Sequence, residues 1–97
     1  MPKGYWIANM TVHDPDVYDR YRRANAKPFA EFGARFLVRG GTQQGREGAA
    51  RPRTVVIEFP SYAEAVACYE SPAYQAARDI RLDVSDGTLI IVEGYDG

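Results

Sequence analysis

The sequence is poor in the residues that bind metals or form covalent cross-links. Its 97 residues include one cysteine and one histidine. A single cysteine cannot form an internal disulfide, so we expect a cytoplasmic protein. Cys68 and His13 also lie too far apart for a usual zinc or iron site. We therefore expect neither a metal nor an organic cofactor.

The sequence also lacks a marked charge of either sign and any long apolar run. A formal net charge of −1 gives no attraction for nucleic acid or for an anionic membrane. No apolar stretch approaches the roughly 18 residues of a membrane span. The first ten residues do not contain the apolar segment of a signal peptide. We expect no nucleic-acid partner and no membrane association.

What is present is typical of one small folded domain. Hydrophobic residues make up 45% of the chain and charged residues 26%, which argues against disorder. We find no internal repeat and no interdomain linker. We therefore treat residues 1–97 as a single domain with one modest core.

Four segments show the patterns of β-strands. Each combines alternating or continuous apolar residues with turn residues at its ends. The segment 41–52 has three glycines and no apolar periodicity, which predicts a mobile connection between two strands. The expected strands are residues 4–12, 34–40, 53–59 and 88–94.

Two helical patterns lie between these strands. Asp14 followed by Pro15 predicts the start of a helix that reaches about residue 32, with a kink or break near residues 27–28 because Pro28 lies inside it. Ser61 and Glu64 have the spacing of a capping box, and that helix restarts at residues 71–72. The order strand, helix, strand, strand, helix, strand predicts a ferredoxin-like βαββαβ α+β fold: a four-stranded antiparallel sheet with two helices on one face.

The sheet face without helices is too apolar to meet water. On the third strand we assign the bulkier row, Val55, Ile57 and Phe59, to the helices. The open face then collects Thr54, Val56 and Glu58, together with Tyr5, Ile7, Asn9, Leu37, Leu89, Ile91 and Glu93. Its five aliphatic side chains would each gain roughly 1.5–3 kcal/mol on burial. We expect a second copy to cover this face in a homodimer.

Glu58 interrupts the apolar run of the third strand. If the second and third strands pair, Arg35 lies opposite Glu58, and a shift of two residues would bring Arg39 near. A covered carboxylate requires such a partner. Glu58 is then either half of a structural ion pair at the dimer rim, or a general base or ligand anchor in a cavity.

Three stretches resemble a known family: "FGARFLVRGG" at 32–41, "VVIEFPSYAEAVACYESPAYQ" at 55–75 and "GTLIIVEGYDG" at 87–97. They are similar to members of domain-of-unknown-function family 1330. The resemblance covers nearly the whole chain and implies a dimeric α+β barrel. That superfamily includes small antibiotic-type monooxygenases, haem-degrading monooxygenases, muconolactone isomerases and stress-responsive proteins. The resemblance implies no particular reaction.

A few polar residues are candidates for a site between the sheet and the first helix. His13 is the residue best suited to move a proton near neutral pH. Tyr18 and Tyr21 share one helix face, and Arg39 is suited to clamp a carboxylate. Tyr74 would reach the same cavity or the dimer seam. Asn9 with Trp6 is similar to the pair used by some monooxygenases of the superfamily, but the two face opposite sides of a strand.

Two functions remain open from the sequence. The first is a cofactor-independent enzyme that performs proton transfer, isomerisation or monooxygenation of a small organic acid or phenol. There, His13 or Glu58 would move the proton and Arg39 would hold the substrate. The second is a non-catalytic dimeric binding, structural or stress-response protein. A sealed or very small cavity would favour this second function, whereas an open pocket lined by Arg39, Glu58 and a tyrosine would favour the enzyme.

Overall fold

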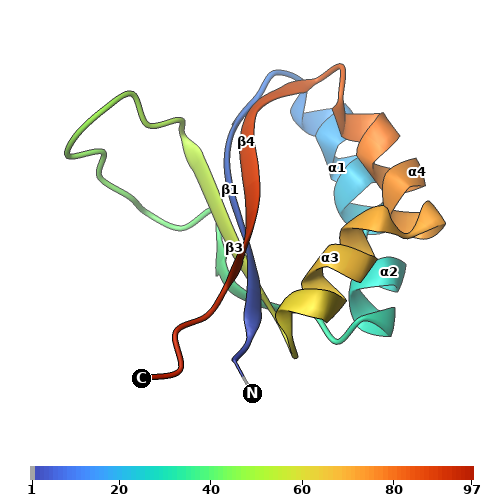
Figure 1. Cartoon of the computed structure of the whole chain (residues 1–97). Coiled ribbons are helices and arrows are strands. Elements are labelled where there is room, and N and C mark those ends of the chain that lie inside the picture. The colour runs from blue at the N-terminus through green and yellow to red at the C-terminus, as the bar shows by residue number, and fades with distance from the viewer. Residues whose placement is uncertain (1) are drawn as a thin grey trace.

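The computed structural model describes residues 2–97, in which four strands and four helices follow one another. They are β1 (Gly4–Val12), α1 (Pro15–Ala24), α2 (Ala26–Glu31), β2 (Arg35–Arg39), β3 (Arg53–Phe59), α3 (Tyr62–Glu70), α4 (Pro72–Arg81) and β4 (Ser85–Glu93). The strands form one antiparallel sheet in the order β2-β3-β1-β4. All four helices cover the same face of the sheet (Figure 1). The predicted ferredoxin-like architecture is confirmed. None of the described helices is long and apolar enough to cross a membrane.

The helix starts are those that the sequence predicts. The Asp14 carboxylate accepts hydrogen bonds from the amides of Asp16 and Val17 at the start of α1. The Ser61 hydroxyl accepts from the amide of Glu64 at the start of α3. Ser71, in an extended conformation, ends α3 and caps α4. Each predicted helix is thus built from two shorter ones.

The break in the first helical pattern lies at Asn25, not at residues 27–28 as expected. Proline lacks an amide donor and its ring collides with the carbonyl four residues earlier. For Pro28 that carbonyl belongs to Ala24, the last residue of α1. The helix therefore ends one turn before the proline and restarts as α2, with the Phe29 amide donating to the Asn25 carbonyl at 3.1 Å.

The last strand begins at Ser85, three residues before the expected start. Asp86-Gly87 looks like a turn in sequence, but β1 is long enough to pair with it: Met10 lies opposite Gly87 and Val12 opposite Ser85. Gly87 has φ 152°, and a β-carbon there would collide with the Asn9 carbonyl. Glycine is therefore required where the two backbones approach this closely.

An aromatic cluster fills the space between sheet and helices. Trp6 is 1% exposed, and its indole donates to the Ala65 carbonyl at 2.8 Å. Its ring contacts Phe59 and Tyr74 at centroid distances of 5.2 and 4.8 Å. The predicted helix-facing row of β3 (Val55, Ile57 and Phe59) is buried in this core, as expected.

The face assignment for β4 is wrong in the sequence analysis. Residues opposite each other in antiparallel strands share a face. Ile91 lies opposite Trp6 and Leu89 opposite Ala8, so both pack against the core. Glu93 lies opposite Gly4, which is buried beneath the Ser61 backbone. The apolar residues of β4 on the open face are Ile90 and Val92, which lie opposite Ile7 and Tyr5.

The face assignment for the end of β2 is wrong as well, because of a β-bulge. Arg35 lies opposite Glu58 as predicted, but between Phe36 and Val38 the register shifts. The extra residue, Leu37, places Val38 on the open face and Arg39 opposite Val55 on the helix side. The sequence pattern does not predict a bulge, because every side chain after the extra residue points to the opposite face from the one that simple alternation assigns to it.

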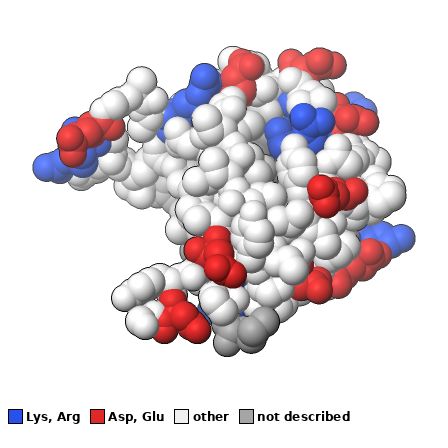
Figure 2. Space-filling view, viewed as in Figure 1, with Lys and Arg blue, Asp and Glu red and all other residues white. Residues whose placement is uncertain are grey.

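The open face carries an apolar row across the whole sheet. Val38 lies opposite Val56, Val56 opposite Ile7, and Ile7 opposite Ile90. In Figure 1 the segment 41–52, here called the arm, projects beyond this face, and the C-terminal segment after β4 projects from the same side. Figure 2 shows a hollow between the two projections, with mostly uncharged atoms along it.

Candidate functional site

The pocket of interest lies between the helix-facing side of the sheet and the helices α1, α2 and α4. It is narrow: the centre of a water-sized sphere can move through about 30 Å³ of it, within about 480 Å³ of empty space that includes open solvent. Rings and aliphatic side chains form much of the wall, among them Trp6, Phe29, Phe36 and Ile57. A wall of this kind suits the flat apolar body of a small organic molecule.

The polar part of the wall is strongly cationic. Four arginines line the pocket: Arg22 from α1, Arg39 from β2, Arg53 from β3 and Arg81 from α4. Among the described residues that line it there is no aspartate or glutamate. A net charge of −1 for the whole chain makes this grouping notable. A pocket lined by charges of one sign concentrates ligands of the opposite sign.

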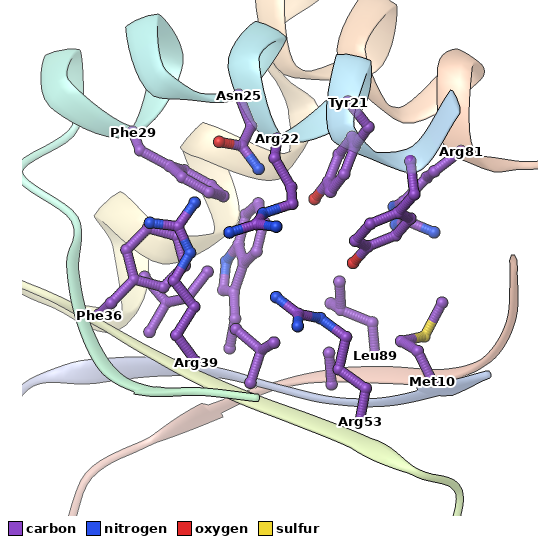
Figure 3. Close-up of a pocket in the computed structure, with 15 residues that line it drawn as sticks. Met10, Tyr21, Arg22, Asn25, Phe29, Phe36, Arg39, Arg53, Arg81 and Leu89 are labelled. Carbon is purple, nitrogen blue, oxygen red and sulfur yellow. The ribbon is translucent and has the colours of Figure 1, made fainter. Parts of the chain in front are cut away.

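The arginines differ in the contacts that their guanidinium groups make within the protein. The buried Arg81 donates to the Tyr74 hydroxyl at 3.2 Å and lies over the Tyr21 ring at 5.4 Å. Arg22 has its guanidinium 3.7 Å from the exposed Asp19 carboxylate. Arg39 stacks on the Phe36 ring, 4.1 Å from its centroid. Figure 3 shows the guanidinium groups of Arg22, Arg39 and Arg53 converging on the central space from the helix side and the sheet side.

Tyrosine hydroxyls border the arginines. Tyr21 and Tyr74 share a hydrogen bond of 2.9 Å. Burial raises the pKa of Tyr74, and the neighbouring Tyr21 adds to the effect. Burial also raises the pKa of Tyr18, with Tyr21 again contributing, although Arg53 opposes this. Burial alone would lower the pKa of Arg81, but the Tyr74 and Tyr21 hydroxyls outweigh it and raise that pKa. At neutral pH the site therefore presents cations and neutral phenols.

The sequence-predicted candidates fall into two groups. Tyr18, Tyr21 and Arg39 line the pocket together, and Tyr74 lies directly behind Tyr21. Arg39 is there because of the bulge. The other three candidates, His13, Glu58 and Asn9, do not line it.

His13 and Glu58 lie apart from the pocket and from each other. The His13 imidazole is exposed where β1 ends, with Nε2 2.6 Å from the Asp86 carboxylate. Glu58 is on the open face, where it accepts a hydrogen bond from the Tyr5 hydroxyl at 3.4 Å. Arg35 is opposite Glu58 in register, but among residues 2–97 no ion pair joins the two.

Asn9 holds the arm. Its side-chain oxygen accepts from the Arg51 amide at 2.8 Å, and its nitrogen donates to the Arg51 carbonyl and the Thr54 hydroxyl, each at 3.1 Å. Trp6 faces the core and Asn9 the open face, as their spacing predicts. The oxygen and the nitrogen of the Asn9 side chain are thus both engaged within the protein, by the arm at Arg51 and by β3 at Thr54.

Sequence reasoning missed Arg22, Asn25, Arg53 and Arg81. They come from three elements and the junction between α1 and α2, and each looks like an ordinary surface residue in the sequence. For Asn25 the sequence does contain one indication of a position near the pocket. This residue lies one turn before Pro28, where the helix must break, and a residue at such a break is free to turn its side chain inward.

A four-stranded antiparallel sheet with helices on one face and an arginine-lined pocket beneath them defines the class: small ferredoxin-like α+β domains. The chain belongs to the family described as domain of unknown function (DUF1330), which matches residues 3–95. The family resemblance stated from the sequence is thereby confirmed. No functionally curated protein matched the chain.

Solved structures share the fold at low sequence identity. A protein of unknown function from Rhodopseudomonas palustris is 19% identical, with 99% of this chain and 85% of that chain covered and a TM-score of 0.75. A dimeric ferredoxin-like protein of unknown function from Thermobifida fusca is 19% identical, with 95% and 91% covered and a TM-score of 0.63. SnoaB, a cofactor-independent oxygenase from Streptomyces nogalater, is 12% identical, with 100% and 97% covered and a TM-score of 0.67. At these identities the likeness establishes the fold.

Proposed function

We propose that this protein binds a small organic acid or acidic phenol in the pocket between sheet and helices. The observation that carries the proposal is the arginine-rich, carboxylate-free wall around an aromatic interior. Guanidinium groups bind carboxylates and phenolates through charge-assisted hydrogen bonds, and the rings offer a flat apolar surface to the rest of the molecule. Arg39 and Arg53, on neighbouring strands, hold the anionic group.

The chemistry that fits this wall is cofactor-independent. Cationic groups in a partly buried site stabilise an enolate or phenolate and so favour loss of a proton from the bound substrate. Such an anion either regains a proton from solvent at a different carbon, which completes an isomerisation, or gives electrons to dioxygen, so that one oxygen atom enters the product and the other leaves as water. The proton leaves through the open mouth of the pocket to solvent. The fold shared with a cofactor-independent oxygenase supports this proposal by analogy.

A second candidate is non-catalytic binding of the same ligand. It is favoured by the absence of imidazole and carboxylate groups among the described residues that line the pocket. His13 and Glu58, the bases suggested by the sequence, lie elsewhere in the subunit. Recovery of the ligand distinguishes the two candidates: an enzyme returns an isomerised or oxygenated product, and a binding protein returns the ligand unchanged.

We further propose that the protein is a homodimer through the open sheet face. Ile90 and Val38 are 54% and 40% exposed in the single chain. Burial of each large aliphatic side chain on that face would contribute roughly 1.5–3 kcal/mol. Two structural relatives are described as dimeric ferredoxin-like proteins, which supports this arrangement.

A thermal-shift screen tests the binding proposal. Ligands that bind the native state raise its apparent stability. We expect aromatic and cyclic acids and acidic phenols to raise the melting temperature, and amines of the same shape to leave it unchanged. Equal shifts for acids and amines, or none for either, would reject the proposed function. Binders are then incubated with protein in air while oxygen consumption and product mass are followed.

A further inference from the structure

Asn25 presents an unpaired amide to the pocket. The residue is 4% exposed and lies at the junction between α1 and α2. Its side chain makes no hydrogen bond that caps α2, and the amide lines the pocket. In Figure 3 the amide points from the helix layer into the central space, between Phe29 and Arg22.

The Asn25 amide atoms keep some contact with the space inside the pocket, since Arg53 Nε is the one fully buried side-chain atom without a partner among residues 2–97. A ligand that filled this space without offering a polar group would leave the amide buried and unpaired, at a cost of about 1–3 kcal/mol. Asn9 shows the ordinary case in the same chain, with its oxygen and nitrogen both bonded to Arg51 of the arm. The helix break does not require asparagine at position 25 either, because Pro28 accounts for it. Asn25 therefore has no evident structural task.

A second unpaired group lies across the pocket. The Nε atom of Arg53 is buried and has no hydrogen-bond partner within the described part of the chain. Arg53 rises from β3 on the sheet side, and Asn25 descends from the helices (Figure 3). The two groups differ in character, since guanidinium only donates whereas the amide both donates and accepts. A ligand that satisfies both must carry two different polar groups.

We propose that the ligand is a hydroxy- or oxo-substituted ring acid, with its carboxylate on Arg39 and Arg53 and its uncharged hydroxyl or carbonyl on the Asn25 amide. The ring fills the space beside Trp6, Phe29 and Phe36. Asn25 is then the residue that selects the second substituent. This inference rests on the proposed function, because it requires an acid to bind in the same pocket.

The selection has a physical basis in the unpaired amide. A site built to hydrogen-bond a hydroxyl discriminates against an analogue that lacks it, because the protein group then stays buried and unpaired. One neutral hydrogen bond made or lost corresponds to about a tenfold change in affinity. The anionic group, by contrast, is common to both ligands and contributes equally to their binding.

The experiment compares benzoate with 2-, 3- and 4-hydroxybenzoate by isothermal titration calorimetry. The best hydroxybenzoate is expected to bind the wild-type protein about tenfold more tightly than benzoate. In Asn25→Ala this preference disappears while the affinity for benzoate is retained. Arg39→Met is the matched control: it weakens benzoate and hydroxybenzoate by the same factor, because it removes charge and not selectivity.

The outcomes separate this inference from the proposed function. If benzoate binds but no hydroxybenzoate binds better, or if Asn25→Ala keeps the preference, the assignment of Asn25 is overturned and the acid-binding pocket stands. If none of the four acids binds to the wild-type protein, the proposed pocket and the role of Asn25 are both rejected. Circular dichroism of each variant establishes that it is folded.

Discussion

Arg35 and Arg39 lie four residues apart on the same strand and yet point to opposite faces of the sheet. Arg35 lies opposite Glu58 in the strand register and is on the open face, whereas Arg39 lies opposite Val55 and lines the pocket. In an unbroken strand, residues four apart share a face. The bulge at Leu37 separates them and thereby supplies the pocket with a cation from an edge strand.

This relationship gives a matched pair of variants. Arg39→Met removes the charge and keeps a stem that packs on Phe36, so we expect affinity for an organic acid to fall about tenfold to a hundredfold, as for loss of a charge-assisted hydrogen bond. Arg35→Met removes the same charge from the other face and leaves the affinity unchanged. Calorimetric titration of both variants measures the effect. Equal losses in the two variants would point to a general electrostatic influence and exclude direct contact with Arg39.

The bulge also shows where sequence reasoning about the fold ends. Alternation identified β3 and its buried row because Val55, Ile57 and Phe59 differ clearly from their polar neighbours. In β4 every residue from Leu89 to Val92 is aliphatic, so alternation carries no information there and the wrong row was chosen. Only the register with β1 decides the face, and register is a long-range property.

The site was predictable in part: Arg39 was a candidate for its chemistry, and the two helix tyrosines for their spacing on one element. Tyr18 and Tyr21 were found because both lie on α1, next to the expected cavity. Asn25, Arg53 and Arg81 meet across three elements, and their meeting depends on how these pack. Residues that look ordinary one by one acquire a function in combination, which spacing along a single chain does not reveal.

The open face predicts the assembly state. Wild-type protein is expected to sediment at twice 10.8 kDa at low micromolar concentration. Ile90→Glu places a charge beside Ile7 in the middle of the apolar row, and we expect it to yield a folded 10.8 kDa monomer. Leu82→Glu alters an equally apolar residue at the end of α4, 44% exposed, and leaves the dimer intact. A wild-type monomer would contradict the interface outright. If Leu82→Glu also dissociated the dimer, the interface could not be assigned to the open sheet face.

The single cysteine predicts a loss of stability in alkali. Burial raises the pKa of the Cys68 thiol from 9.0 to about 12, and the Glu31 and Glu64 carboxylates add to the shift. The unfolded chain then loses its proton at lower pH than the folded one. The free energy of unfolding contributed by this group is constant below pH 9 and falls as the pH rises toward 12.

Unfolding in urea at pH 8 and pH 10 measures this contribution. We expect the wild-type protein to lose on the order of 1 kcal/mol more between the two pH values than Cys68→Ala does. The comparison uses the change with pH and not the absolute stability, since the variant also leaves a small cavity. Tyr18 and Tyr74, whose raised pKa values act in the same direction above pH 10, are common to both proteins. Parallel curves would exclude a buried, protonated thiol.

Replacing asparagine with alanine is expected to affect the free energy of unfolding differently at positions 9 and 25. Asn9→Ala removes three hydrogen bonds between β1 and the chain at Arg51 and Thr54, so we expect the free energy of unfolding to fall by about 2–3 kcal/mol. Asn25→Ala removes an amide that has no protein partner, and its backbone is already in the right-handed helical region. Without ligand, we expect its stability to be unchanged or raised by up to about 1 kcal/mol. Urea unfolding at one fixed protein concentration compares the two, because the stability of a dimer depends on concentration.

A loss in Asn25→Ala as large as that in Asn9→Ala would mean that the amide supports the fold. A gain would identify Asn25 as a residue retained at a cost in stability, as expected of a group that serves a ligand.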